Sequence, residues 1–192
     1  AIQSSVSTLG TAAIAAEAMT AMLESISGIT AFGIGIGMMT VVGQCIGAKK
    51  YEESKYYIVK LSILSEIIVA ICSIAVFAIT KPVIYLSSME AASAKMCIEM
   101  MTAITIVKPI VWVFSFIPVY GMRAAGDVRF SMIVSTLSMW CCRVFLCIYL
   151  IRFQGFGPMA VWIGMFTDWS VRGIIFSIRF LHGKWMEHEV IK

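Results

Sequence analysis

The sequence has little charge for its length. Lys, Arg, Asp and Glu make up 14% of its 192 residues, whereas hydrophobic residues make up 60%, and the mean hydropathy is +0.91. A soluble domain is typically about 25% charged and about 45–50% apolar. A soluble fold of this length would not have enough interior to bury so many apolar side chains. The composition therefore excludes an ordinary soluble domain and predicts an integral membrane protein.

The sequence also lacks the groupings that build metal, redox and nucleic-acid sites. None of the six cysteines belongs to a CxxC pair, and the two histidines, His182 and His188, both lie near the C-terminus. We therefore predict no metal site and no cofactor. The net charge of +4 comes from lysines and arginines in short connectors, where membrane topology explains them better than a nucleic-acid partner does.

A signal peptide is also missing from the N-terminus. The first residues, AIQSSVSTLG, have no initiator Met, no basic start and no apolar core followed by a cleavage site. We expect the sequence to begin partway through a longer protein.

Long apolar runs fill most of the sequence instead. A membrane-spanning helix needs about 20 mostly apolar residues, and we predict an all-α transmembrane bundle of about five spans, preceded by the end of a possible sixth. The predicted helices cover residues 11–47, 53–80, 91–122, 128–152 and 157–181, and residues 182–192 form a tail. The first range is long, but two helices and a turn would be cramped within it, so we predict one helix ending near Gly47.

The basic residues of the connectors predict the orientation in the membrane. One side holds Lys49, Lys50, Lys55, Arg123, Arg129, Arg179, Lys184 and Lys192, and the other holds Lys81, Lys95 and Arg152. The richer side should be cytoplasmic. The prediction is a multi-pass protein of the plasma membrane, in contact with the lipid bilayer, with a cytoplasmic C-terminus.

Three stretches are more specific than apolar composition. They are VGQCIGAKKYEESK at 42–55, GMRAAGDVRFSM at 121–132 and IGMFTDWSVRGIIFSIRFLHGKW at 163–185. In this order and spacing they resemble the C-terminal half of the multidrug and toxic compound extrusion (MATE) family, as does LGTAAIAAEAMTAMLESIS near the start. The residues that carry the resemblance in the two turns are Gly43, Gln44, Gly47, Arg123, Gly126 and Asp127.

The resemblance implies a fold and a function. Members of this family have twelve helices in two lobes, so the chain would supply helices eight to twelve, and the missing N-terminal lobe would be its partner. The implied function is secondary active efflux of small-molecule drugs or toxic compounds, often cationic, in exchange for H+ or Na+, in a bacterial inner membrane. Two alternatives are a lipid-linked sugar flippase of the same superfamily and a passive membrane scaffold. An intramembrane enzyme is not predicted, because no HExxH motif or membrane-embedded histidine is present.

Ionisable side chains inside predicted spans are the candidate functional residues, because charge is unfavourable in the membrane. Glu24, Glu66 and Lys108 are candidates for a cation-coupling or substrate cleft, and Lys108 could pair with an acid. Met22 is a further cleft candidate, because flexible methionines suit surfaces that accept varied ligands. Glu24 could instead be a hydrated residue near the outer interface.

A second predicted group is an intramembrane ionic cluster. Asp168 and Arg172 are four residues apart, so they share one helix face. Arg143, in the middle of the preceding span, could reach Asp168. The cluster could fix helix packing, or it could take part in proton relay or gating.

Overall fold

The prediction of an all-α bundle is confirmed. A computed structural model describes residues 10–154 and 157–186, and no strand occurs among them. The elements are α2 (Thr11–Gly47), α3 (Tyr51–Leu86), α4 (Ala91–Ala124), α5 (Val128–Ser138), the π-helical η2 (Met139–Phe145), α6 (Leu146–Phe153), α7 (Met159–Leu181) and the short η3 (Lys184–Met186). The predicted end of a span before α2 and tail residues 187–192 lie outside the described residues.

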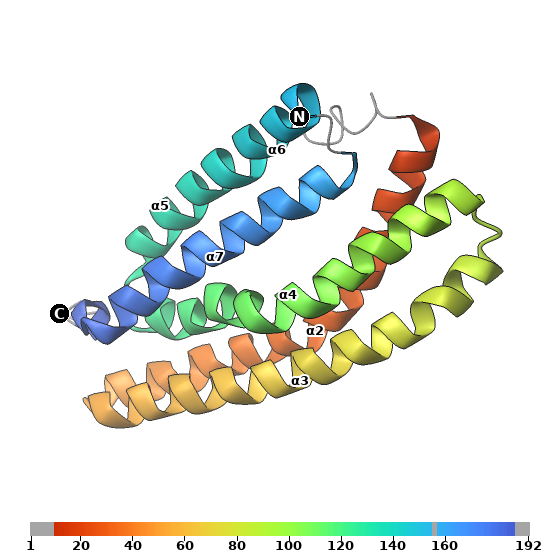
Figure 1. Cartoon of the computed structure of the whole chain (residues 1–192). Helices are drawn as coiled ribbons and strands as arrows, with labels where there is room; N and C mark the ends of the chain where they lie inside the picture. Colours follow the sequence, from red (N-terminus) through yellow and green to blue (C-terminus); the bar gives the residue numbers. More distant parts are fainter. Residues whose placement is uncertain (1–9, 155–156, 187–192) are drawn as a thin grey trace.

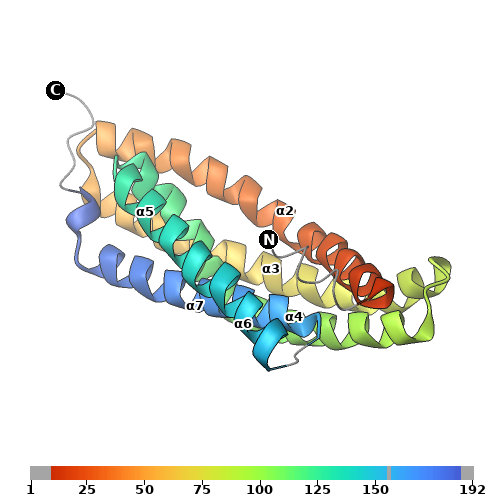
Figure 2. The ribbon, with the colours of Figure 1, turned by 90° about the horizontal axis from the view of Figure 1, so that it is seen from above.

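The helices run alternately up and down in an elongated bundle (Figure 1). α2, α3 and α4 pack against one another, and α4 also packs against α7. α5, η2 and α6 continue one another as a single rod, which contacts α7 (Figure 2). α4 therefore joins the α2–α3 pair to the helices that follow it.

Four stretches of the described residues are long and apolar enough to cross a membrane: α2, α3, α4 and the rod from Val128 to Phe153. α7 has 23 residues, about 35 Å at 1.5 Å per residue, and is not among them. Its polar residues Asp168 and Arg172 are buried against other helices, so α7 does not present them to lipid. The predicted five spans thus correspond to four strongly apolar stretches and one less apolar helix.

Five predicted helix boundaries differ from the structure by one to six residues, and two of them involve prolines. α3 continues past Pro82 to Leu86, beyond the predicted end at residue 80. A proline removes one backbone hydrogen bond, yet α3 continues, and Ile84 is buried beyond it. α7 begins at Met159, with Pro158 as its N-cap, two positions after the predicted start.

The buried faces of α2 and α3 are built from small residues. On α3 the buried positions include Ser54, Ser62, Ser65, Ser73 and Thr80, while many of its isoleucines point outward. Membrane helices gain little from burying apolar side chains away from lipid, so close packing of small residues holds them together. Thr80 satisfies its hydroxyl by donating to the carbonyl of Val76 at 2.9 Å.

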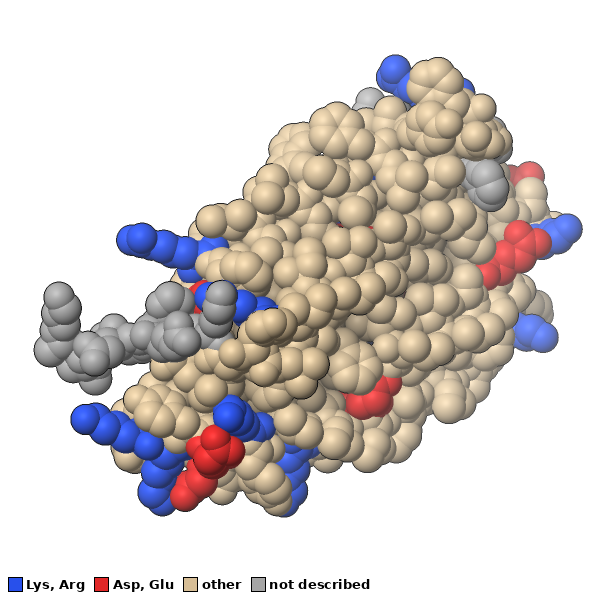
Figure 3. Space-filling model, turned by 60° about the vertical axis from the view of Figure 1, so that its left-hand side comes forward, with Lys and Arg blue, Asp and Glu red and all other residues tan. Residues whose placement is uncertain are grey.

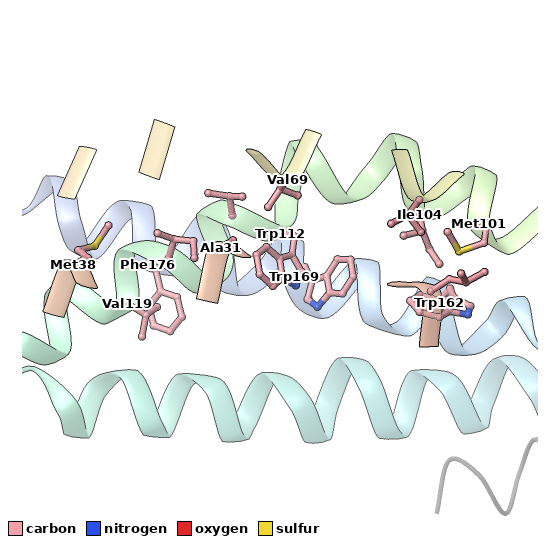
Figure 4. Close-up of a cluster of buried hydrophobic side chains, with 14 of the residues drawn as sticks. Ala31, Met38, Val69, Met101, Ile104, Trp112, Val119, Trp162, Trp169 and Phe176 are labelled. Carbon is pink, nitrogen blue, oxygen red and sulfur yellow. The ribbon is translucent and has the colours of Figure 1, made fainter. Parts of the chain in front are cut away.

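The larger buried side chains form a core between α4 and its neighbours. Figure 4 shows Met38, Val119 and Phe176 toward one end, Trp112 and Trp169 in the middle, and Met101, Ile104 and Trp162 toward the other. This core extends along most of the bundle. It fixes α4 and α7 relative to each other along much of their length.

Charged side chains gather toward the ends of the molecule. In Figure 3 a broad uncharged belt lies between groups of Lys and Arg, and an acidic patch is isolated within the belt. The α2–α3 and α4–α5 turns and the C-terminal end of α7 lie at the same end of the bundle (Figure 1). This end carries Lys49, Lys50, Lys55, Arg123, Arg129 and Arg179.

Close approach of α2 and α4 depends on Gly35. A Cβ atom there would lie 2.7 Å from Cδ2 of Tyr120, whereas a Cβ at Gly37 would meet nothing within 4 Å. We predict that Gly35→Val forces the Tyr120 ring aside and destabilises the bundle by about 1–3 kcal/mol. The measurement is the temperature at which half of the detergent-solubilised protein leaves the monodisperse peak. Gly37→Val is the matched control, and equal losses for the two variants would contradict the close contact.

Candidate functional site

Lys108 of α4 is a charged residue buried within the bundle. Its side chain is fully buried, and its Nζ lies 2.5 Å from Oε1 of Glu24 on α2. The same Nζ donates to the backbone carbonyl of Glu24 at 2.9 Å and to the hydroxyl of Ser27 at 2.7 Å. An ammonium has three N–H donors, so these three acceptors satisfy it completely. This arrangement explains how a charged lysine is accommodated there.

The backbone around Gly28 leaves room for this pair. A Cβ at Gly28 would lie 3.5 Å from both Nζ of Lys108 and Cζ2 of Trp112. α2 therefore packs closely at Gly28 against the side chains of Lys108 and Trp112. Glu24 keeps 15% of its side chain exposed, whereas the side chain of Lys108 is fully buried.

An aromatic column on α4 connects Lys108 to a second charged pair. Trp112 and Phe116 follow Lys108 at intervals of one helical turn and lie on the same face. Nζ of Lys108 lies 5.1 Å from the Trp112 ring centroid, and the Trp112 and Phe116 rings stack at 5.0 Å. The guanidinium carbon of Arg172 lies 4.9 Å from the centroid of the Phe116 ring. Cation–π contacts of this kind stabilise cations that have been removed from water.

The second pair is Asp168 and Arg172 of α7, as the spacing of four residues suggests. Nη2 of Arg172 donates to Oδ2 of Asp168. The hydroxyl of Ser138, at the end of α5, donates to Oδ1 of the same carboxylate at 2.5 Å. Ser138 was not among the sequence candidates, because a serine in an apolar span gives no signal of its own.

Arg143 does not join this pair by an ion pair or hydrogen bond within the described part of the chain. It lies in the π-helical segment Met139–Phe145. A π-helical turn has more residues than an α-helical one, so side chains within it are rotated away from the positions that an ordinary helix predicts. The carboxylate of Asp168 still acts electrostatically on Arg143.

Glu66 and Met22, the other cleft candidates, lie elsewhere. Glu66 is half-buried on α3 and borders a separate pocket with Phe114 and Pro118. Met22 is 68% exposed and lines a shallow hollow at the start of α2. The structure thus brings together Glu24 and Lys108 from the four predicted cleft residues.

The family-motif turns have structural roles at the basic end of the bundle. Gly126 has a φ of 94°, and the amide of Asp127 donates to the carbonyl of Met122 at 3.1 Å. This is a helix C-terminus that favours glycine. Arg123 donates to Ser131 at 3.0 Å, and Arg179 donates to Asp127 at 2.9 Å, so the turn is tied to α5 and α7.

The first motif turn ends α2 in a similar way. α2 ends at Gly47, and the left-handed residue that reverses the chain is Lys49, with a φ of 59°. Gly43 and Gln44 occupy the last turns of α2, and the Gln44 side chain is exposed. Lys50 and Lys55 pair with Glu53 and Glu52, each at 2.9 Å. These exposed pairs contribute little to stability.

The described residues contain no group of three or more His, Cys, Asp and Glu side chains that could hold a metal ion. The arrangement therefore offers two buried ion pairs and an aromatic column between them.

Comparisons with known proteins agree with the motifs. The chain is 25% identical over 175 residues to the "Probable multidrug resistance protein NorM" of Thermotoga maritima, covering 88% of this chain and 36% of the relative. It is 27% identical over 161 residues to the "Uncharacterized transporter YisQ" of Bacillus subtilis, covering 83% of this chain and 35% of the relative. The chain thus spans about a third of the length of these curated relatives. No solved structure matches it significantly.

The family assignment rests on most of the chain. The model of the MatE family matches residues 1–149, which include the α2–α3 joint, the α4–α5 turn and both members of the Glu24–Lys108 pair. The chain therefore belongs to the MatE family.

Proposed function

We propose that the full-length protein containing this chain is a secondary active exporter of amphipathic, often cationic compounds, driven by inward movement of H+ or Na+. The chain would form most of one lobe, and the other lobe would come from the rest of the same polypeptide. The observation that carries the proposal is Glu24, whose carboxylate is paired with a buried lysine and whose side chain is 15% exposed. Family membership supports the same function.

The ion pair suggests how cation binding could change the fold. Lys108 is the counter-ion of Glu24 in this structure. A proton would remove the charge of Glu24, and Na+ or a cationic compound would replace the ammonium as its partner. Either event weakens a contact between α2 and α4, so it favours a different arrangement of the two helices.

Lys108 retains other partners when this contact weakens. The Ser27 hydroxyl, the Glu24 carbonyl and the Trp112 ring all lie around Nζ. The ammonium therefore keeps these contacts while Glu24 exchanges cations. Trp112 then transmits a shift of Lys108 to Phe116 and Arg172 through direct ring contacts.

The alternatives explain fewer of these features. The GQCIGA sequence at 43–48 and the DWSVR sequence at 168–172 match motifs of the exporter family and favour an exporter over a lipid-linked sugar flippase. A passive scaffold gives no reason for a partly exposed carboxylate inside the bundle, where ionisable groups are unfavourable. No catalytic reaction is assigned to the chain.

The orientation is also part of the proposal. The basic end, with the α2–α3 turn and the end of α7, would face the cytoplasm of a bacterial plasma membrane. Cations entering from outside would then reach Glu24 from the opposite end of α2.

Export from proteoliposomes tests the proposed function. We expect the reconstituted full-length protein to move ethidium across the membrane when a H+ or Na+ gradient is imposed in the opposite direction. Movement should stop when both gradients are collapsed. Ethidium transport that continues at the same rate without either gradient would contradict antiport, and absence of transport with both gradients would contradict the function.

A further inference from the structure

A pocket between α3, α4 and α7 is lined by Glu66, whose carboxylate takes no part in the Glu24–Lys108 pair. The pocket has a volume of about 290 Å³, and its walls are almost entirely apolar. They include Ile63, Phe114, Pro118 and Phe180, together with Ser62 and Glu66 of α3. Small-molecule sites typically measure about 300–1,000 Å³ and combine apolar walls with a few placed polar groups, so this pocket suits a small ligand.

Two polar atoms of the residues that line the pocket have no hydrogen-bond partner among the described residues. Oε2 of Glu66 and Oγ of Ser62 are buried and have no hydrogen-bond partner in the structure. They lie four residues apart on one face of α3. Pro118 has no N–H to offer the carbonyl of Phe114 four residues earlier. The carboxylate of Glu66 and the hydroxyl of Ser62 therefore both belong to residues that line one apolar pocket.

The negative charge of Glu66 indicates which class of ligand the pocket would bind. No Lys or Arg lines it, and a carboxylate buried without a partner is strongly unfavourable. The ligand that complements these groups has a positive charge, N–H donors and a compact apolar body. A neutral acyl chain would fill the volume and leave Glu66 without a partner.

We propose that this pocket is a second binding site, separate from the Glu24–Lys108 pair, for small lipophilic amines in their ammonium form. The ammonium donates to Glu66, and the apolar body packs against Phe114 and Ile63. Val59, Ile63, Ile67 and Phe114 are each about half exposed on the outer surface of these helices, so the ligand enters from the side of the bundle. This site does not depend on the proposed transport function.

Equilibrium dialysis with the full-length protein in lipid nanodiscs tests this site. The probe is 2-(1-naphthyl)ethylammonium, and its neutral counterpart is 2-(1-naphthyl)ethanol. The wild-type protein should bind the amine saturably and at least tenfold more tightly than the alcohol, because a hydrogen bond to a charged group is stronger than a neutral one. Glu66→Gln should lose at least tenfold in amine affinity and little in alcohol affinity.

Two further variants make the result decisive. Ser177→Phe fills the pocket from α7 and keeps the carboxylate, so it should abolish binding of both probes. Glu99→Gln removes an exposed carboxylate from α4 and should leave amine binding unchanged. Equal affinity for amine and alcohol, or full amine binding by Glu66→Gln or by Ser177→Phe, would overturn the proposal. No ion gradient is present in dialysis, so failure here is distinct from failure of the transport experiment.

Discussion

Replacing Lys108 by Met should destabilise the full-length protein by about 3–5 kcal/mol, the effect expected when one partner of a buried ion pair is removed. The substitution leaves Glu24 without its counter-ion and Ser27 without its donor. The measurement is the temperature at which half of the detergent-solubilised protein leaves the monodisperse peak.

The double variant Glu24→Leu, Lys108→Met distinguishes the ion pair from simple packing. It removes both charges, so it should recover much of the lost stability, since an apolar pair can replace a buried ion pair of similar volume. Lys95→Met is the matched control, because Lys95 lies exposed on the same helix. A double variant no more stable than Lys108→Met would show that the two residues act independently.

The second large effect is expected at Arg172. Arg172→Met leaves Asp168, which is fully buried, with Ser138 as its remaining side-chain partner and removes the cation from the face of Phe116. A loss of about 3–5 kcal/mol is expected again. Arg172→Lys should recover only part of it, because an ammonium cannot reproduce the planar guanidinium that stacks on a ring.

Adding Asp168→Asn to Arg172→Met tests the origin of this loss. The asparagine can still accept from Ser138 but carries no charge, so the double variant should be more stable than Arg172→Met alone. Arg152→Met, at an exposed position near the end of α6, serves as control and should change little. An Arg172→Met protein that unfolds at the same temperature as Arg152→Met would refute the structural role of the Asp168–Arg172 pair.

The helices were predictable because their causes are local. Runs of apolar residues specify spans, and positions 168 and 172 share a face in any α-helix. The Glu24–Lys108 pair joins residues 84 positions apart, and no periodicity specifies which face of α2 meets which face of α4. The two charges meet because α2 and α4 pack against each other, with Gly28 next to Lys108 and Trp112.

The residues that were harder to place depend on irregular backbone or on tertiary packing. Arg143 lies in a π-helical segment, and an ordinary helical register does not describe it. The extent of α3 past Pro82 could not be inferred from proline alone. Glu66 lies within an apolar helix, but its pocket is formed by α3, α4 and α7 together, which sequence spacing does not show.

The most direct test of the central claim measures gradient-driven ethidium movement in proteoliposomes for Glu24→Gln and Glu99→Gln side by side. Glutamine keeps an acceptor for Lys108 but has no charge to exchange among cations. We predict that Glu24→Gln folds, inserts and loses at least tenfold in the gradient-dependent rate, while Glu99→Gln transports like the wild type. A folded Glu24→Gln protein with a wild-type gradient-dependent rate would contradict a coupling role for Glu24.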